Sequence, residues 1–261
     1  MKARSRLLTN ETQRSPLVGR ALAGLALMVT VLTLSGWFSH SNFSRGEYKT
    51  DRTIELPDFW KHWDEFDAGW YELIAKRGYI HYPNSQSTVA FFPGYPLAMR
   101  AAAPLFGGNV SVAGVVLTLL SGVIAVGLFA NWCRDRLDHR AAVLAVALIL
   151  VYPYSFYLAG PIYADAFFLA ASLGAFHFVE RDRTVLAGLC GALATATRPV
   201  APAIVLALVL RVAERRGALR SYSLVSVGAS ESGRAGAAVR LRRWAEHNKV
   251  PVGLEIGRAH V

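Results

Sequence analysis

Apolar positions along this chain come in long runs rather than in narrow amphipathic stripes. The first run covers residues 21–38, and further runs follow at 110–132, 141–158, 161–179 and 184–212. Apolar runs of about 18 residues or more are long enough to cross a bilayer as helices. The pattern therefore predicts an all-α fold, a polytopic transmembrane helical bundle.

Two further features interrupt the apolar pattern. Residues 89–106 contain three prolines and Arg100, so we expect a broken or interfacial segment that returns to the bilayer. The run 184–212 is too long for one simple helix and is interrupted by Arg198 and Pro199. We expect two short helices there, meeting at an outward-facing corner.

Charged clusters between the runs indicate an orientation. Residues 1–20 carry five Lys or Arg and one acid, and arginines recur at 134–140 and 180–183. The positive-inside rule places these three segments in the cytoplasm. Residues 39–90, with eight acids and six Lys or Arg, then form an external loop long enough to carry function.

Composition supports a membrane protein and argues against other classes. The chain is 53% hydrophobic and only 18% charged, with a mean hydropathy of +0.31, which leaves little polar surface for a soluble domain. The net charge of +10 does not indicate nucleic-acid binding, because the basic residues lie at the ends of apolar runs. Cys133 and Cys190 have no metal-ligand or disulfide spacing. Membrane lipids are the expected partners, and no metal is expected.

The expected organisation has five parts. Residues 1–20 form a cytoplasmic N-terminus, 21–38 a first transmembrane helix that serves as a signal anchor, and 39–90 an external loop carrying amphipathic helices. Residues 91–219 hold the remaining transmembrane helices, and 220–261 form an aberrant or disordered tail.

The tail has no apolar span and no steady period. Its last seven residues, Glu255 to Val261, are encoded by one reading frame of a common sequencing adapter. We interpret residues 220–261 as the result of truncation, with adapter read-through and a frameshift; a natural basic tail is the alternative.

Acids and aromatics concentrate in the external loop, above all in FDAGWYELIAKRGY, Phe66 to Tyr79. If this region is one helix, a spacing of three and four puts several of its residues on one face: Trp60, Asp64, Asp67, Tyr71 and Ile74. The alternative is that Asp67 only caps a helix that ends at Gly78.

Two charged residues lie within apolar runs. Asp165 is the only acid between Ala141 and Val179, and a carboxylate at membrane depth costs about 2.5 to 3.5 kcal/mol, so it requires a partner or a hydrated cavity. Its alternative role is a hydrated cap at the interface. Arg198 is suited to hold a lipid phosphate bidentately or to reach the headgroups.

Six short motifs, in order along the chain, resemble the PIG-V-type mannosyltransferases, which are GT-C glycosyltransferases. They are FDAGWY followed by IAKRGY, then AFFPGYP, P-x-S-F, YADAFF and ATRPV. The likeness covers about residues 63–212. It implies a GT-C-like fold and transfer of mannose from a polyprenyl-phosphate sugar donor to a lipid or glycan acceptor, outside the cell membrane and without a cofactor or bound metal.

The resemblance also implies roles for individual residues. Asp67 corresponds to the acid that activates the acceptor hydroxyl, and Asp64 is a second candidate because WDEFDAGWY offers a second aspartate. Asp165 stands where the family commonly has Glu, and Arg198 matches an arginine suited to the donor phosphate. Three aromatic residues in the same motifs are expected to contact substrate: Trp70, Tyr71 and Tyr163.

Relatives carry further spans after the ATRPV region, so the resemblance implies that this chain is an N-terminal fragment. Two other functions remain open. A transporter or flippase of lipid-linked or small polar solutes would use Asp165 and Arg198 as intramembrane charges. A non-catalytic membrane scaffold would leave the acids and aromatics of the loop unexplained.

Overall fold

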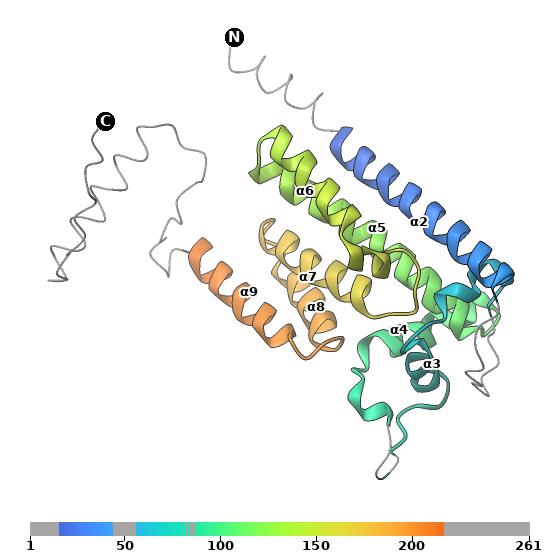
Figure 1. Ribbon diagram of the computed structural model, residues 1–261. Helices are drawn as coiled ribbons and strands as arrows, with labels where there is room; N and C mark the ends of the chain where they lie inside the picture. Colours follow the sequence, from blue (N-terminus) through green and yellow to red (C-terminus); the bar gives the residue numbers. More distant parts are fainter. Residues whose placement is uncertain (1–15, 44–55, 82, 84–86, 217–261) are drawn as a thin grey trace, which may run out of the picture. The chain divides into compact units, whose positions relative to one another are not determined.

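The computed structural model describes residues 16–43, 56–81, 83 and 87–216. All regular structure in these residues is helical (Figure 1), which confirms the all-α prediction. The predicted tail, 220–261, and most of the predicted cytoplasmic N-terminus lie outside the described residues.

Short 3-10 helices (η) lie between several of the α-helices along the chain. In order they are α2 (Pro16–Asn42), η1 (Asp58–Trp63), α3 (Ala68–Arg77), η2 (Thr88–Ala90), α4 (Gly94–Ala102), η3 (Ala103–Phe106), α5 (Val110–Arg136), α6 (His139–Val151), η4 (Pro153–Leu158), α7 (Asp165–Val179), α8 (Thr184–Thr195) and α9 (Ala201–Arg215).

Among the described helices, α2 and α5 are long and apolar enough to cross a membrane, judged by length and composition. Each has 27 residues, which corresponds to about 40 Å of helix. The apolar helices α6, α7 and α8 have only 13, 15 and 12 residues. The number of membrane crossings therefore stays a prediction.

Prolines and turns divide the predicted spans. The run 141–158 is α-helical only to Val151, because Pro153 lacks the N–H that a continuing α-helix needs; the 3-10 helix η4 follows. The run 161–179 becomes helical only at Asp165. The run 184–212 forms two helices, α8 and α9, as its arginine and proline predicted. In the run 89–106, α4 has only nine residues.

Helix α5 is the element on which the others pack. It contacts α2, α4, α6 and α7, and α8 packs in turn on α7. At Gly122 of α5, an added Cβ would lie 2.2 Å from the Leu158 carbonyl oxygen, so only glycine permits η4 to approach so closely.

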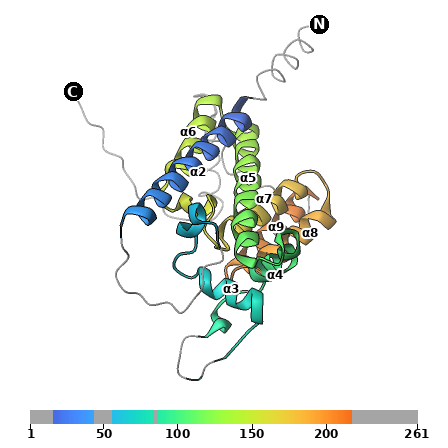
Figure 2. The ribbon, with the colours of Figure 1, turned by 90° about the vertical axis from the view of Figure 1, so that its right-hand side faces the viewer.

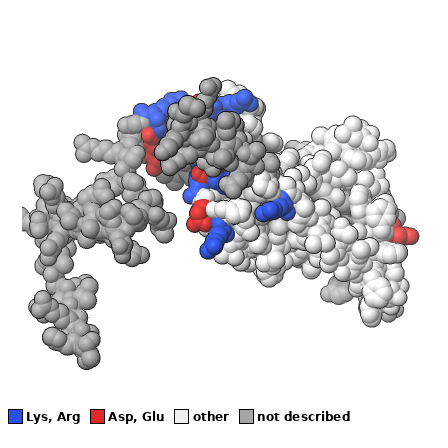
Figure 3. Space-filling view, turned by 90° about the horizontal axis from the view of Figure 1, so that it is seen from above, with Lys and Arg blue, Asp and Glu red and all other residues white. Residues whose placement is uncertain are grey.

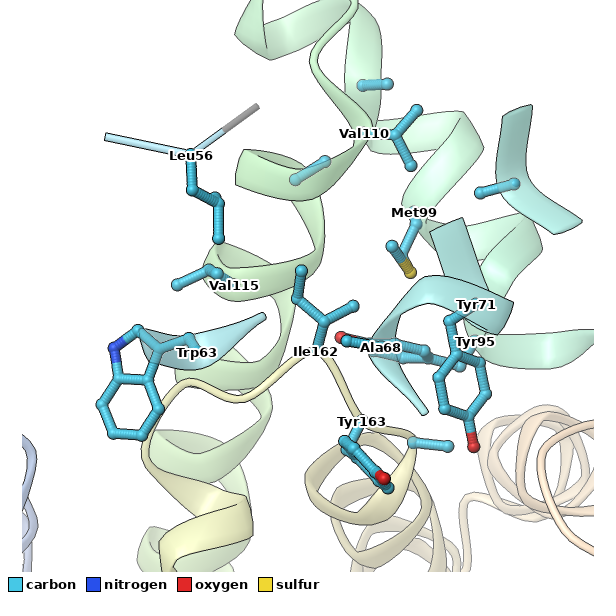
Figure 4. Close-up of a cluster of buried hydrophobic side chains, with 14 of the residues drawn as sticks. Leu56, Trp63, Ala68, Tyr71, Tyr95, Met99, Val110, Val115, Ile162 and Tyr163 are labelled. Carbon is cyan, nitrogen blue, oxygen red and sulfur yellow. The ribbon is translucent and has the colours of Figure 1, made fainter. Parts of the chain in front are cut away.

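One hydrophobic cluster surrounds the first turns of α5 (Figure 4). It joins η1, α3, α4 and residues 159–164, and both ribbon views place α3 and α4 at this end of α5 (Figures 1 and 2). A second cluster joins α2, the later turns of α5, and α6. The first cluster supports the candidate active site.

Candidate active site

The acid-rich part of residues 39–90 is a turn between two helices, not one helix. η1 ends at Trp63 and α3 begins at Ala68, and Phe66 between them has a positive φ of 52°. The predicted common face of Trp60, Asp64, Asp67, Tyr71 and Ile74 is therefore wrong. A left-handed residue breaks the helical repeat on which that face depended.

Asp67 lies at the N-terminus of α3 with its side chain exposed. It occupies the N-cap position, but its carboxylate accepts no capping hydrogen bond. Its backbone N–H instead donates to the Tyr163 hydroxyl oxygen at 2.8 Å. The backbone of Asp67 is thus held beside Tyr163, and its carboxylate is not engaged in capping α3.

Asp64, the second candidate acid, has a different environment. It is only 5% exposed and follows η1, whose last residue, Trp63, accepts a 3.3 Å hydrogen bond from the Ile162 N–H. Of the two acids, Asp67 is therefore accessible from solvent and Asp64 is not.

Asp165 and Arg198 form an ion pair. Asp165 is the first residue of α7, and Arg198 belongs to the corner between α8 and α9. Both side chains are about one-third exposed, and the guanidinium also lies 5.9 Å from the centre of the Phe168 ring. The partner that an acid in an apolar run requires is therefore an arginine 33 residues later.

Tyr71 connects Asp67 with this ion pair. Its ring makes edge contacts with Tyr95 and Tyr163, at centroid distances of 5.3 and 5.8 Å. Burial raises the pKa of the Tyr71 phenol to about 12; Arg198 acts against this, and the carboxylates of Asp165 and Asp67 add to it. One phenol thus lies within electrostatic reach of all three charged groups.

The loop before α4 packs against aromatic residues of α3. Phe91 stacks on Trp70 at 6.1 Å and makes an edge contact with Tyr71 at 5.2 Å. The Gly94 N–H donates to the Ala196 carbonyl at 2.6 Å, and a Cβ at Gly94 would lie 2.8 Å from that oxygen. The AFFPGYP and ATRPV motifs therefore meet directly, through a position that has no room for a side chain.

Two residues that support the candidate site were not predicted from the sequence. Buried Tyr95 donates to the Gly114 carbonyl at 3.0 Å and lies 2.7 Å from the Thr118 hydroxyl. Arg100 donates to the carbonyls of Ala75 and Ile74, at 2.6 and 3.0 Å. The available signal for Arg100 was a lone charge in an apolar run, while its partners lie 25 and 26 residues earlier in the sequence.

An apolar groove of about 750 Å³ lies between α8 and α9. Among its lining residues are Thr195 and Ala196, which lead to Arg198 at the corner. Elsewhere it is lined by small and aliphatic side chains, such as those of Gly191, Leu208 and Val209. Within the described part of the chain, no group of three or more His, Cys, Asp or Glu could hold a metal ion.

Comparison with known proteins finds similarity to mammalian mannosyltransferases. GPI alpha-1,6-mannosyltransferase 2 of Mus musculus is 33% identical over 143 residues, and the proteins of that name from Cricetulus griseus and Rattus norvegicus are 32% identical. The matched part is 51% of this chain and 28% of each relative. No family model and no solved structure matches. The similarity confirms the PIG-V-type resemblance, and the chain spans well under half the length of these relatives.

Proposed function

We propose that this chain carries the catalytic loop of an integral membrane mannosyltransferase, which transfers mannose from a polyprenyl-phosphate donor to a lipid or glycan acceptor. The observation that carries the proposal is the arrangement around Tyr163: its hydroxyl accepts the Asp67 N–H, its ring contacts that of Tyr71, and Asp165, which pairs with Arg198, follows it by two residues. The named relatives are mannosyltransferases, which agrees with it.

Asp67 is the proposed general base. Its carboxylate takes the proton of the acceptor hydroxyl while that oxygen attacks the anomeric carbon of mannose. The bond from this carbon to the phosphate oxygen breaks, and its electron pair leaves with the polyprenyl phosphate. Direct displacement inverts the anomeric centre.

Arg198 is the proposed phosphate ligand. A guanidinium has five N–H donors, so the ion pair with Asp165 leaves others for a phosphate. Positive charge there stabilises the negative charge that develops on the leaving group. Asp165 in this view orients Arg198, and Trp70, Tyr71 and Tyr163 shape the sugar site.

The groove between α8 and α9 suits the donor's polyprenyl chain. It is almost entirely apolar and leads to the corner that carries Arg198. A lipid lying there would present its phosphate to the guanidinium.

The proposed setting is a multi-pass membrane protein with a cytoplasmic N-terminus and the site on the outer face. Figure 3 shows a face of which much of the described surface carries no charged side chain, which suits contact with lipid. Exposed leucine and valine side chains on α2, α5 and α6 agree with this setting.

The substitution Asp67→Asn tests whether Asp67 is the general base. Membranes containing the full chain are supplied with radiolabelled polyprenyl-phosphate mannose, and transfer to extracted lipids and glycans is counted. We expect Asp67→Asn to lower transfer by about a hundredfold or more, because an amide cannot accept the proton. Asp58→Asn is the control, since Asp58 is an exposed acid of the same loop paired only with Lys61 in the described structure.

Near-normal transfer by Asp67→Asn at equal expression would reject Asp67 as the base. Absence of transfer by the wild-type chain would reject the activity for this chain.

A further inference from the structure

Phe66, the residue before the candidate base, has a backbone conformation that large side chains avoid. Its φ is 52°, and within the described part of the chain Asp182 is the other non-glycine residue with a positive φ. Aspartate is several-fold enriched in this left-handed region, whereas a bulky residue there is an outlier. Local backbone preference therefore accounts for the aspartate but not for the phenylalanine.

The turn around Phe66 is of a kind that favours glycine. The Ala68 N–H donates to the Glu65 carbonyl at 3.1 Å and closes a β-turn, of which Phe66 and Asp67 are the two central residues. Asp67 has a φ of −84° and a ψ of 2°, and these angles after a positive φ match a type II′ turn. Glycine, asparagine and aspartate dominate the first central position of such turns, so phenylalanine is disfavoured there.

Packing does not account for the phenylalanine either. Its side chain is 75% exposed, whereas Trp63 and Asp64, just before it in the sequence, are buried. It belongs to none of the hydrophobic clusters that the described residues form. A strained residue whose ring is left exposed is typical of a site that binds a ligand.

Phe66 adjoins the carboxylate that an acceptor hydroxyl must reach. Consecutive Cα atoms are about 3.8 Å apart, and both Phe66 and Asp67 have exposed side chains. A hydroxyl that Asp67 deprotonates must come within about 3.2 Å of its carboxylate. The turn is fixed on both sides, because Tyr163 accepts the Asp67 N–H at 2.8 Å and Trp63 accepts the Ile162 N–H at 3.3 Å. A molecule bound at Asp67 is therefore also next to Phe66.

We propose that Phe66 binds the acceptor by stacking its ring on the C–H face of an acceptor sugar. A sugar carries C–H groups on the faces of its ring and hydroxyls around its edge, so it can rest on an aromatic ring while one hydroxyl reaches a carboxylate. The contact holds that hydroxyl in position beside Asp67. The inference rests on the proposed function, since it takes Asp67 as the base and leaves the donor to Arg198.

Phe66→Gly tests the proposal in the full chain. Transfer is measured from radiolabelled polyprenyl-phosphate mannose to methyl α-mannoside, a soluble acceptor probe. We expect the KM for methyl α-mannoside to rise about tenfold, while kcat and the KM for the donor stay within about twofold of wild type. The melting temperature in detergent should be no lower than that of wild type, because glycine adopts a positive φ without steric cost. A side chain kept only for folding would lower it.

Two further substitutions at this position separate stacking from simple apolar contact. Phe66→Trp should keep the KM for methyl α-mannoside within about twofold of wild type, because another aromatic ring can stack on the sugar. Phe66→Leu should raise that KM as much as Phe66→Gly does. Phe59→Ala is the matched control, since Phe59 is a half-exposed aromatic residue of η1 in the same part of the chain, and it should leave the KM unchanged.

Three kinetic results would overturn the proposal. An unchanged KM for methyl α-mannoside in Phe66→Gly would show that the ring does not bind the acceptor. Equal KM values for Phe66→Leu and Phe66→Trp would indicate an apolar contact, such as one with lipid, rather than stacking. An equal rise in the KM for the donor would indicate distortion of the whole site.

A measurement without transfer separates this inference from the proposed function. Methyl α-mannoside, added without donor, should change the tryptophan fluorescence of Phe66→Trp in a saturable way and leave that of wild type unchanged. If this change occurs but the wild-type chain transfers no mannose, the proposed reaction is wrong and sugar binding at Phe66 is retained. Absence of the change overturns the inference whether or not the chain transfers mannose.

Discussion

At the scale of single residues, a hydroxyl far along the sequence positions the candidate base. The Tyr163 hydroxyl oxygen accepts the Asp67 N–H across 96 residues of sequence. Sequence alone could not separate this role from that of an interfacial aromatic, because both need a tyrosine near the outer surface. The contact follows from packing of residues 159–164 against η1 and α3.

Tyr163→Phe should reduce mannose transfer about tenfold while expression stays normal. The change removes the acceptor of the Asp67 N–H and leaves the ring, so the carboxylate loses its fixed position. Tyr157→Phe is the matched control, since its ring packs 4.8 Å from that of Tyr163. Equal losses of transfer in the two variants would show that the Tyr163 hydroxyl has no specific role in positioning Asp67.

At the scale of elements, α3 is held at both ends. Its first residues adjoin Tyr163, and its last carbonyls accept hydrogen bonds from Arg100 of α4. Gly78 ends the helix with a φ of 84°, as its sequence position predicted. Helix α4 thus supports the orientation of the turn that carries Asp67, although its sequence predicts a broken or interfacial membrane segment.

Arg100→Met should lower the free energy of unfolding by about 1 to 3 kcal/mol, because two helix-end carbonyls lose a charged donor. Hydrogen exchange should speed up across residues 68–77. Arg77→Met serves for comparison, as Arg77 is an exposed arginine in the last turn of α3. Unchanged exchange in Arg100→Met would show that packing alone holds α3.

Gly94→Ala tests the contact between α4 and the corner before α9. The new methyl group would lie 2.8 Å from the Ala196 carbonyl oxygen and 2.7 Å from the Thr197 hydroxyl, so the two segments must separate. We expect about 1 to 3 kcal/mol of destabilisation, measured by chemical unfolding in detergent. Gly127→Ala, where no atom lies within 4 Å of the added carbon, should have little effect. Similar stability of the two variants would contradict this account.

At the scale of the whole molecule, orientation across the membrane is the open prediction. The charge pattern places the loop before α3 outside and the α5–α6 turn inside. Helices α2 and α5 have the length to join these sides.

Cysteine labelling measures that orientation. In a chain whose Cys133 and Cys190 are replaced by alanine, Asp58→Cys and His139→Cys provide one exposed thiol each. An impermeant maleimide added to intact cells should label the first and not the second, and permeabilised cells should show both. Labelling of both in intact cells would reject the topology.

The sequence by itself determined the helical class, the long apolar helices α2 and α5, the break at Pro199 and the residues resembling a mannosyltransferase site. These depend on local composition, proline chemistry and motif order, which act within a few residues of each other. Only the tertiary structure decided that Arg198 pairs with Asp165, that Tyr163 holds Asp67 and that Arg100 caps α3. Such contacts join segments dozens of residues apart, and they depend on how helices pack around α5, which no local pattern encodes.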